Sequence, residues 1–407
     1  MSTAVVLKSL IQESKDGEWG KGEPFEDSVK MAVIRGTDFE AVRNGNIDAL
    51  PIRYIPKRIA DRKTLQPNDI LLETAGGSKD RPTGRSLFIR SSIIHRSELP
   101  LTCASFSRFI RIDPTKADPR YIFWHLQYLY DADYLRPYHT QHTGVARFQY
   151  TVFSEREELV IPPLPIQRKI AGILSAYDDL IENNTRRIEI LEEMARSIYR
   201  EWFVKFRFPG HEQVQMVDSE LGLIPEGWEV KKLGEVIRFK NGKSIKVEEE
   251  GDYLVYGSNG IIGRTNEARY QNAIIIGRVG AYCGSLIYSK SAFNASDNTI
   301  IAESASEKIS IQLAFYVLEE MNLRHYAGGA AQPLLTQTVI KEIPALVPDL
   351  KTNKKFQIII ANLIDFKSNL TNKIQNLRKT RDLLLPRLIS GEIDVENLDI
   401  NTSQIAA

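Results

Sequence analysis

An internal repeat constrains this sequence more than any other feature. The motif that runs from Ile161 to Ile170 returns as Val347 to Phe356, at an offset of 186 residues that carries Pro162 onto Pro348. Without a gap, the same offset aligns Ile173 with Ile359, Leu174 with Ile360, Tyr177 with Leu363, Asp179 with Asp365, Asn183 with Asn369, Ile188 with Ile374 and Leu191 with Leu377. A register held over this length indicates an internal duplication.

The repeat extends upstream in a looser form. Its offset drifts there, as loops of different length require, while the order of the matched segments stays the same. The matched segments are Asn68–Leu72 with Asn272–Ile276, Ser86–Ile89 with Ser285–Tyr288, Phe123–Leu126 with Phe315–Leu318, and Thr143–Ala146 with Gly328–Ala331. The order predicts a globular unit, a long helix, a second globular unit and a second long helix.

Both helical segments carry apolar residues at the 3–4 spacing of a coiled-coil seam. The predicted seam consists of Ile170, Leu174, Tyr177, Ile181, Ile188, Leu191, Ile198, Phe356, Ile360, Leu363, Leu370, Ile374 and Leu377. The second segment is more polar, because Lys367 and Arg381 take seam positions. Asn184 also falls on the seam, either as a buried residue that fixes register or as a simple exposed asparagine.

The first helix is expected from about Ile170 to about Arg207, roughly 55 Å at 1.5 Å per residue. In the second helix, Pro386 is expected to stop or kink the chain before Arg387, with Gly391 at the C-terminal stop. Antiparallel pairing of the two helices would place the globular units at opposite ends, in a pseudo-two-fold molecule.

The predicted fold class is therefore α+β, with two mixed α/β globular domains separated by two long helices that form an antiparallel coiled coil. A chain of 407 residues is too long for one ordinary core, which agrees with several domains. The predicted boundaries are 1–160 for the first domain, 161–210 for the first helical spacer, 211–346 for the second domain, 347–395 for the second spacer and 396–407 for a tail.

The globular segments alternate short β-like runs with Gly-rich turns, and each closes with a helix near Pro119–Tyr130 or Ser310–Met321. The turns Ala75–Lys79, Tyr256–Gly260 and Gly277–Gly280 carry Lys, Arg, Ser and Asn. Such loops can approach phosphates and base edges, although they also suit ordinary surface turns. The candidate DNA-binding residues are Lys79, Arg81, Arg85, Gln141, His142, Arg147, Ser258, Asn259, Arg264, Arg278, Tyr282 and Gln332.

Charge and cysteine content narrow the class of protein. The formal net charge of +1 argues weakly against a chain that binds DNA without a partner protein. Residues 51–150, however, are locally basic, with 16 Lys/Arg against 9 Asp/Glu. That basic region is either a DNA-facing surface or a solvated face without a ligand. Only Cys103 and Cys283 occur, which favours a reducing cytoplasm over a disulfide framework. No stretch has the length of a membrane span.

Motifs that would carry chemistry are not convincing. Pro348-Asp349 followed by Asp365-Phe366-Lys367 matches a nuclease spacing, in which the carboxylates must converge on a metal from neighbouring strands, but Asp365 and Lys367 lie in the predicted helix. Gly242-Lys243-Ser244 lacks the upstream glycine of a phosphate-binding loop, because Ile237 stands in that place. No methyltransferase turn and no zinc spacing is present, and His139 and His142 are interpreted as polar loop residues.

Three motifs resemble those of type I restriction-modification specificity (S) subunits. They are Ile161–Ile170 leading into Ile173–Ile181, Ile224–Val230 at the start of the second half, and Leu384–Ile393 at its end. The resemblance implies a non-catalytic, cytoplasmic DNA-recognition subunit of a phage-defence complex that reads a bipartite, asymmetric double-stranded site with one domain per half-site. It also implies docking of two methyltransferase (M) subunits and of restriction (R) subunits. No cofactor or metal is expected on this chain, since S-adenosylmethionine, ATP and Mg²⁺ would belong to the partners.

Two other interpretations remain open at this stage. The chain could be a specificity subunit of a related defence system or of a fused methyltransferase-nuclease, or a coiled-coil adaptor without a DNA role. The bases read do not follow from the sequence, because diverged loops have no residue-to-base code.

Overall fold

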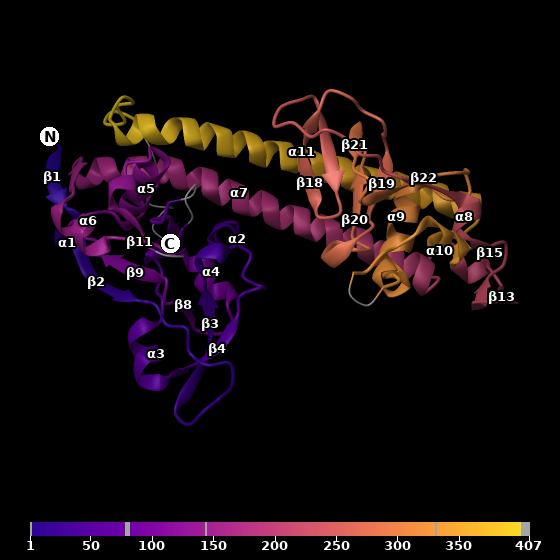
Figure 1. The fold of residues 1–407 in the computed structure, drawn as a ribbon, viewed down its shortest axis with the longest axis horizontal. Coiled ribbons are helices and arrows are strands. Elements are labelled where there is room, and N and C mark those ends of the chain that lie inside the picture. Colours follow the sequence, from indigo (N-terminus) through magenta and orange to yellow (C-terminus); the bar gives the residue numbers. More distant parts are fainter. Residues whose placement is uncertain (1, 78–81, 143–144, 330–331, 400–407) are drawn as a thin grey trace. The chain divides into compact units, whose positions relative to one another are not determined.

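The protein is a mixed α/β chain built as two compact units. The computed structural model describes residues 2–77, 82–142, 145–329 and 332–399. Unit 1 consists of Met1–Ile188 with Leu370–Ala407, and unit 2 of Glu189–Asn369. The two long helices, α7 (Leu164–Tyr199) and α11 (Leu350–Ile389), each give one part to each unit (Figure 1).

Unit 1 contains a four-stranded antiparallel sheet in the order β2-β9-β5-β7 and a three-stranded sheet in the order β4-β3-β8, in which β3 and β8 run parallel. A third sheet has the order β10-β11-β6, and β1 pairs with β12. The strands are β1 (Thr3–Val6), β2 (Ile11–Asp16), β3 (Ser28–Ile34), β4 (Ile52–Pro56), β5 (Ile70–Glu73), β6 (Ala75–Gly77), β7 (Ser86–Phe88), β8 (Leu101–Cys103), β9 (Ser107–Ile112), β10 (His139–His142), β11 (Val145–Phe148) and β12 (Glu158–Ile161). The shorter helices are α1 (Leu7–Leu10), α2 (Phe39–Arg43), α3 (Lys57–Lys63), α4 (Ser91–Arg96), α5 (Pro119–Asp131) and α6 (Tyr150–Arg156).

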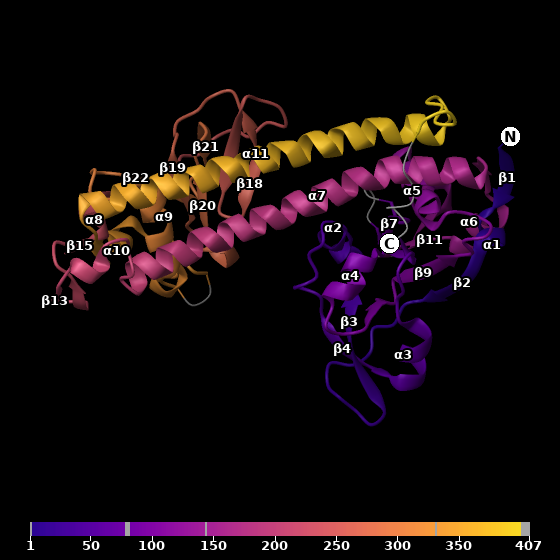
Figure 2. The same cartoon turned by 180° about the vertical axis from the view of Figure 1, so that it is seen from behind.

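Unit 2 repeats this topology. Its four-stranded sheet has the order β16-β22-β19-β20 and its three-stranded sheet β18-β17-β21, again with one parallel pair, β17 with β21. The strands are β13 (Met216–Ser219), β14 (Gly222–Pro225), β15 (Glu229–Lys232), β16 (Ile237–Asn241), β17 (Tyr253–Gly257), β18 (Gly260–Thr265), β19 (Ala273–Gly277), β20 (Leu286–Ser289), β21 (Phe293–Ala295), β22 (Thr299–Ser304) and β23 (Pro344–Val347), and the shorter helices are α8 (Leu233–Val236), α9 (Ile311–Glu320) and α10 (Gln337–Glu342). Figure 2 shows the same elements from behind.

The matched sequence segments occupy matched elements. Asn68–Leu72 enters β5 and Asn272–Ile276 enters β19, while the Phe123 and Phe315 segments lie in α5 and α9. Asn68 and Asn272 both have a positive φ, at 72° and 50°, so the same left-handed step leads into each central strand. The duplication is therefore confirmed in the topology of the described residues. The fourth match falls partly outside them, at 143–144 and 330–331.

The central strands form around apolar runs that are buried on both faces, Ile70–Leu72 in β5 and Ala273–Ile276 in β19. All four residues of β5 and all five of β19 are buried. Each covering helix begins at a side-chain cap: Asp118 accepts the backbone N–H groups of Arg120 and Tyr121 in α5, and Ser310 accepts that of Leu313 in α9. The predicted terminal helices are thus confirmed.

One position in each unit requires glycine, because the backbone of a neighbouring loop passes very close to it. Gly17 follows β2 and Gly242 follows β16, and a Cβ at either place would overlap a backbone carbonyl oxygen, that of Ala104 or that of Ser296. Both glycines also donate their N–H to the strand beside them, to Ser107 and Thr299 respectively. Only glycine fits such an approach, and the duplicated fold needs it twice.

Within each unit the two long helices pair antiparallel, as predicted. In unit 1, Lys169 donates to the carbonyl of Glu396 at 2.6 Å while Asp178 pairs with Arg381. In unit 2, Glu192 pairs with Lys367 and the Trp202 ring lies 6.0 Å from that of Phe356. In both cases the residue numbers rise along α7 and the turn after it as they fall along α11 and the segment that follows α11.

Two predictions about the helix ends are wrong in detail. α7 starts at Leu164, six residues before Ile170, and ends at Tyr199 in a π-helical turn, Arg200–Val204. α11 continues through Pro386 to Ile389, because Leu385 and Leu388 are buried in the core of unit 1 and hold the last turn in place. Gly391, at φ 78°, follows that end as expected.

None of the helices in the described part of the chain combines the length and the apolar character that crossing a bilayer requires. Cys103 and Cys283 are both buried free thiols. Burial raises the pKa of the Cys103 thiol to about 12.

Candidate nucleic-acid interface

In unit 2, three loops meet at one end of the paired sheets. They are the β17–β18 turn, the segment that follows β19, and the turn that precedes β22. Together they line a pocket of about 280 Å³ whose walls are Gly257, Ser258, Asn259, Ile262, Val279, Tyr282, Ser296 and Asn298. The structure thus brings two of the predicted turns together, with Ser258, Asn259 and Tyr282 in the lining.

Hydrogen bonds fix the backbone of these loops. The Asn298 carbonyl accepts the Arg278 N–H at 2.9 Å and the Ser258 hydroxyl at 2.5 Å. The Ser285 hydroxyl donates to the Ser258 carbonyl at 2.9 Å. Because backbone groups hold the loops, the exposed side chains of Asn259 and Tyr282 remain available to a ligand.

The other predicted residues of unit 2 lie in two places, beside this pocket and at the far end of the β17–β18 hairpin. The loop that carries the exposed Gln332 lies beside the site, since Pro333 accepts the Gly280 N–H and Arg278 accepts the Leu335 N–H. Arg264 lies at the other end of β18, where its guanidinium donates to the Gly251 carbonyl.

In unit 1, the predicted residues cluster on the β10–β11 hairpin. Gln141 and Arg147 are exposed, and His142 is the last residue of β10. His139 and His142 were expected in a loop, which is wrong, because both pair with β11. Lys79 and Arg81 lie outside the described residues.

The Arg85 side chain forms its hydrogen bonds inside unit 1. Its guanidinium donates to both Glu73 oxygens, at 2.9 and 2.7 Å, and to the Gly36 carbonyl at 2.8 Å. The Glu73 side chain is only 3% exposed. A bidentate pair of this kind supports the turn and leaves little of the Arg85 guanidinium for DNA.

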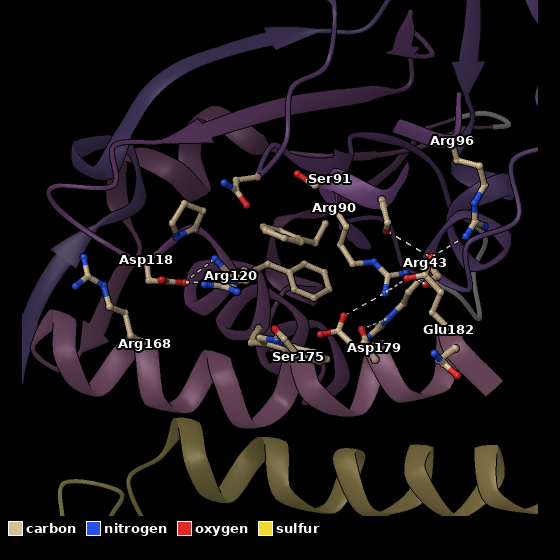
Figure 3. A pocket seen from close by; sticks show the side chains of 18 of the residues that line it. Arg43, Arg90, Ser91, Arg96, Asp118, Arg120, Arg168, Ser175, Asp179 and Glu182 are labelled. Carbon is tan, nitrogen blue, oxygen red and sulfur yellow. Dashed lines mark hydrogen bonds and ion pairs between the residues drawn. The ribbon is translucent and has the colours of Figure 1, made fainter. Parts of the chain in front are cut away.

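Sequence reasoning missed a groove of about 820 Å³ between the globular part of unit 1 and α7 (Figure 3). Figure 3 shows Arg43, Arg90 and Arg96 directed toward the carboxylates of α7. Arg90 pairs with Glu182 at 2.7 Å and Arg96 with the same carboxylate at 3.3 Å. These pairs attach the globular part to the helix, so we interpret the groove as a structural joint.

At the centre of this joint, Asp178 lies between two guanidinium groups. Arg43 pairs with it at 3.1 Å and Arg381, from α11, pairs with its other oxygen. Both guanidinium carbons lie over the Trp124 ring, at 5.2 and 5.8 Å from its centroid. Burial lowers the pKa of Arg43, and the Asp178 carboxylate opposes that shift. Arg381, the polar seam residue, thus has its partner on α7.

All predicted seam residues are buried or half-buried. Asn184 is 3% exposed, so it is not a surface asparagine, and its side-chain nitrogen has no partner in the described part of the protein. Asp365 and Lys367 lie in α11 and pair with Lys290 and Glu192. Within the described ranges, no three His, Cys, Asp or Glu residues gather as metal ligands.

A buried amide joins each globular part to its long helix. Gln167 on α7 accepts the Asp118 N–H at 2.9 Å, and Asn353 on α11 accepts the Ser310 N–H at 3.2 Å. Both amides also donate to a backbone carbonyl, that of Pro162 or that of Glu307. Residues 167 and 353 are related by the 186-residue offset, so the duplication preserves this hydrogen bond between a buried amide and the globular part.

Replacing the buried amide of Gln167 should destabilise unit 1. We expect Gln167→Ala to lower its free energy of unfolding by about 1–3 kcal/mol, because the buried Asp118 N–H loses its acceptor. Thermal unfolding and hydrogen exchange at the start of α5 would measure the effect. The exposed neighbour Arg168 provides the control, Arg168→Ala, and an equal effect of both changes would contradict the role of the amide.

The chain shares sequence and fold with known proteins. Residues 225–378 match the family described as Type I restriction modification DNA specificity domain. The chain is 27% identical over 309 residues to the type I restriction enzyme MjaIX specificity subunit of Methanocaldococcus jannaschii, covering 67% of this chain and 70% of that one. It is 23% identical to the HindI specificity subunit of Haemophilus influenzae, covering 90% and 98%. A crystal structure of a type I restriction-modification system S subunit from M. genitalium has a TM-score of 0.58 at 18% identity, covering 95% and 96%.

Proposed function

Because this chain belongs to the family of type I restriction-modification specificity subunits, we propose that it supplies the sequence recognition of such a complex and catalyses no reaction itself. Each globular part would read one half of a bipartite, asymmetric double-stranded DNA site. The two long helices would dock the M subunits, and R subunits would join the same assembly. S-adenosylmethionine, ATP and Mg²⁺ chemistry would belong to those partners.

One observation carries this proposal: the same fold occurs twice with different loops at the same edge. Unit 1 presents the β10–β11 hairpin with Gln141 and Arg147. Unit 2 presents a pocket lined by Asn259 and Tyr282, with Arg278 bonded to the adjoining Asn298 loop. Base edges in the major groove offer distinct donor and acceptor patterns, so two different side-chain sets suit two different half-sites.

Methylation mapping tests the proposal. We expect a host without other methyltransferases, carrying this chain with its M subunit, to methylate a split and asymmetric motif. Replacing the loops of one unit by those of another specificity subunit should change one half of that motif. A continuous palindromic motif, or methylation that does not need this chain, would overturn the proposal.

A coiled-coil adaptor without a DNA role predicts a different result for charge reversal. If the loops contact DNA, Arg147→Glu and Arg278→Glu should each weaken DNA binding by the assembled complex, and they should reduce its dependence on salt. Arg85→Glu is a poor test, because it would break the Glu73 pair inside unit 1. Unchanged DNA affinity in both loop variants would favour the adaptor.

A further inference from the structure

The loop pocket of unit 2 contains polar groups whose hydrogen-bonding capacity is unused. Ser296 is one of the residues that line the pocket and is only 8% exposed, and its buried hydroxyl has no partner among the described residues. The Arg278 Nε is buried beside the same loops and is also unpaired there. Unpaired buried polar groups are uncommon in native proteins, so two of them beside one pocket mark these loops as a candidate functional site.

Two amides lie at the rim of the pocket. Asn259 and Asn298 are exposed, and neither side chain forms a hydrogen bond within the described part of the chain. The backbone of Asn298 is nevertheless fixed by Ser258 and Arg278, so its amide is presented from a rigid loop. Tyr282, another lining residue, is 57% exposed and adds an aromatic ring to the pocket.

The chemistry of this rim suits a purine. A side-chain amide forms two hydrogen bonds with adenine, to N6 and N7, and no other base presents that donor and acceptor pair in the major groove. An aromatic or apolar side chain can contact the methyl group of thymine, the partner of adenine. The exposed Asp297 beside Asn298 disfavours a phosphate at the same place, because both carry negative charge.

We propose that this pocket is the base-reading centre of unit 2, and that Asn259 and Asn298 recognise adenine in the major groove of double-stranded DNA. The assignment rests on the proposed function and adds to it the residues and the base. Ser296 and the exposed Tyr282 belong to the lining of the same pocket.

Unit 1 is built differently at the corresponding connection. Between β3 and β4 its chain forms α2, and the preceding Gly36 carbonyl accepts the Arg85 guanidinium. Unit 2 has the short β17–β18 turn there, which leaves space for the pocket. The recognition of adenine by these two asparagines should therefore act in only one half of the DNA site.

The test uses the complete complex of this chain with its M subunit. Asn259→Ala, Asn298→Ala and the double variant are compared with wild type on duplexes in which each base pair of each half-site is changed in turn. We expect the double variant to lose about ten-fold to a hundred-fold of its preference for adenine at one or two positions of one half-site. The other half-site should keep its full preference.

Asn266→Ala is the matched control, since Asn266 is exposed in the same unit at the far end of the β17–β18 hairpin. It should leave every preference unchanged, and thermal unfolding should show that all the variants remain folded. Wild-type discrimination by the double variant, or an equal loss in both half-sites, would overturn the assignment while the proposed function stands. A wild-type complex that methylates no split motif would overturn the proposed function, and the assignment with it.

Discussion

Asp178→Ala should destabilise unit 1 by about 3–5 kcal/mol, because it leaves two largely buried guanidinium groups without their shared carboxylate. The Arg381 and Asp178 side chains are only 11% and 12% exposed, and that of Arg43 is 22% exposed. Arg381 keeps its pair with Asp382 at 2.8 Å, whereas Arg43 keeps only its hydrogen bond to the Gln127 side-chain oxygen and loses its carboxylate partner. Hydrogen exchange should locate the loss in unit 1, and thermal unfolding should give its size.

Two further variants make this prediction sharper. Glu192→Ala removes the partner of Lys367 on the same pair of helices, but that pair is 36% and 45% exposed and should contribute at most about 1 kcal/mol. Replacing Arg43, Asp178 and Arg381 together by apolar residues should recover much of the stability, because well-packed apolar side chains can substitute for a buried ion pair. If Asp178→Ala costs no more than Glu192→Ala, the buried network does not hold unit 1 together.

Phe356→Ala should destabilise unit 2 to a similar extent, by about 3–5 kcal/mol. Phe356 is fully buried, and its ring centroid lies 4.8 Å from that of Phe203 and 6.1 Å from that of Tyr316. The change removes a large apolar side chain and several edge-to-face ring contacts, and it leaves a cavity. Denaturant unfolding followed by tryptophan fluorescence would report the loss, since Trp202 lies beside the ring.

Ile358→Ala is the control for Phe356→Ala. Ile358 is also apolar and stands two residues further along α11, but it is 64% exposed. Its removal should change the free energy of unfolding by no more than about 0.5 kcal/mol. Hydrogen exchange should show the loss from Phe356→Ala in unit 2, where the ring lies in the core. Equal effects of the two changes would show that the aromatic cluster does not carry the stability of that unit.

Much of the fold could be predicted, because its strongest signals are local and repeated. The apolar runs at Ile70–Leu72 and Ala273–Ile276 became buried central strands, and the heptad spacing became α7 and α11. Local patterns do not predict how strands are arranged. The internal repeat does add to them, because two halves with the same order of segments are expected to share one topology. The strand orders of the four-stranded sheets agree between the two units, and so do those of the sheets β4-β3-β8 and β18-β17-β21.

Pro386 shows where a local rule failed. A proline inside a helix costs about 3 kcal/mol, which predicts a stop at this position. Burial of Leu385 and Leu388 contributes about 1.5–3 kcal/mol each, so the packing of the last turn offsets the proline. A local pattern cannot weigh these contributions, because the core that receives the two leucines comes from a distant part of the sequence.

The candidate site was predicted only in part, for a related reason. Arg85 and Arg278 look alike in sequence, as arginines in polar, Gly-containing turns, yet Arg85 binds Glu73 across the register of β5 and β7. Asn298 was not selected, although its turn-forming neighbours Ser296 and Asp297 were a usable signal. Which polar loop residues bind inside the fold and which remain free depends on contacts between segments far apart in the chain.

The division of the long helices has a consequence for synthesis at the ribosome. The core of unit 1 includes Leu385, Leu388 and Val395, which are among the last described residues of the chain, whereas unit 2 closes with residues up to Asn369. Domains usually fold in the order in which they are made, from the N-terminus onward. In this protein the order is reversed, because unit 1, although translated first, stays incomplete until its final helical turns have left the ribosome.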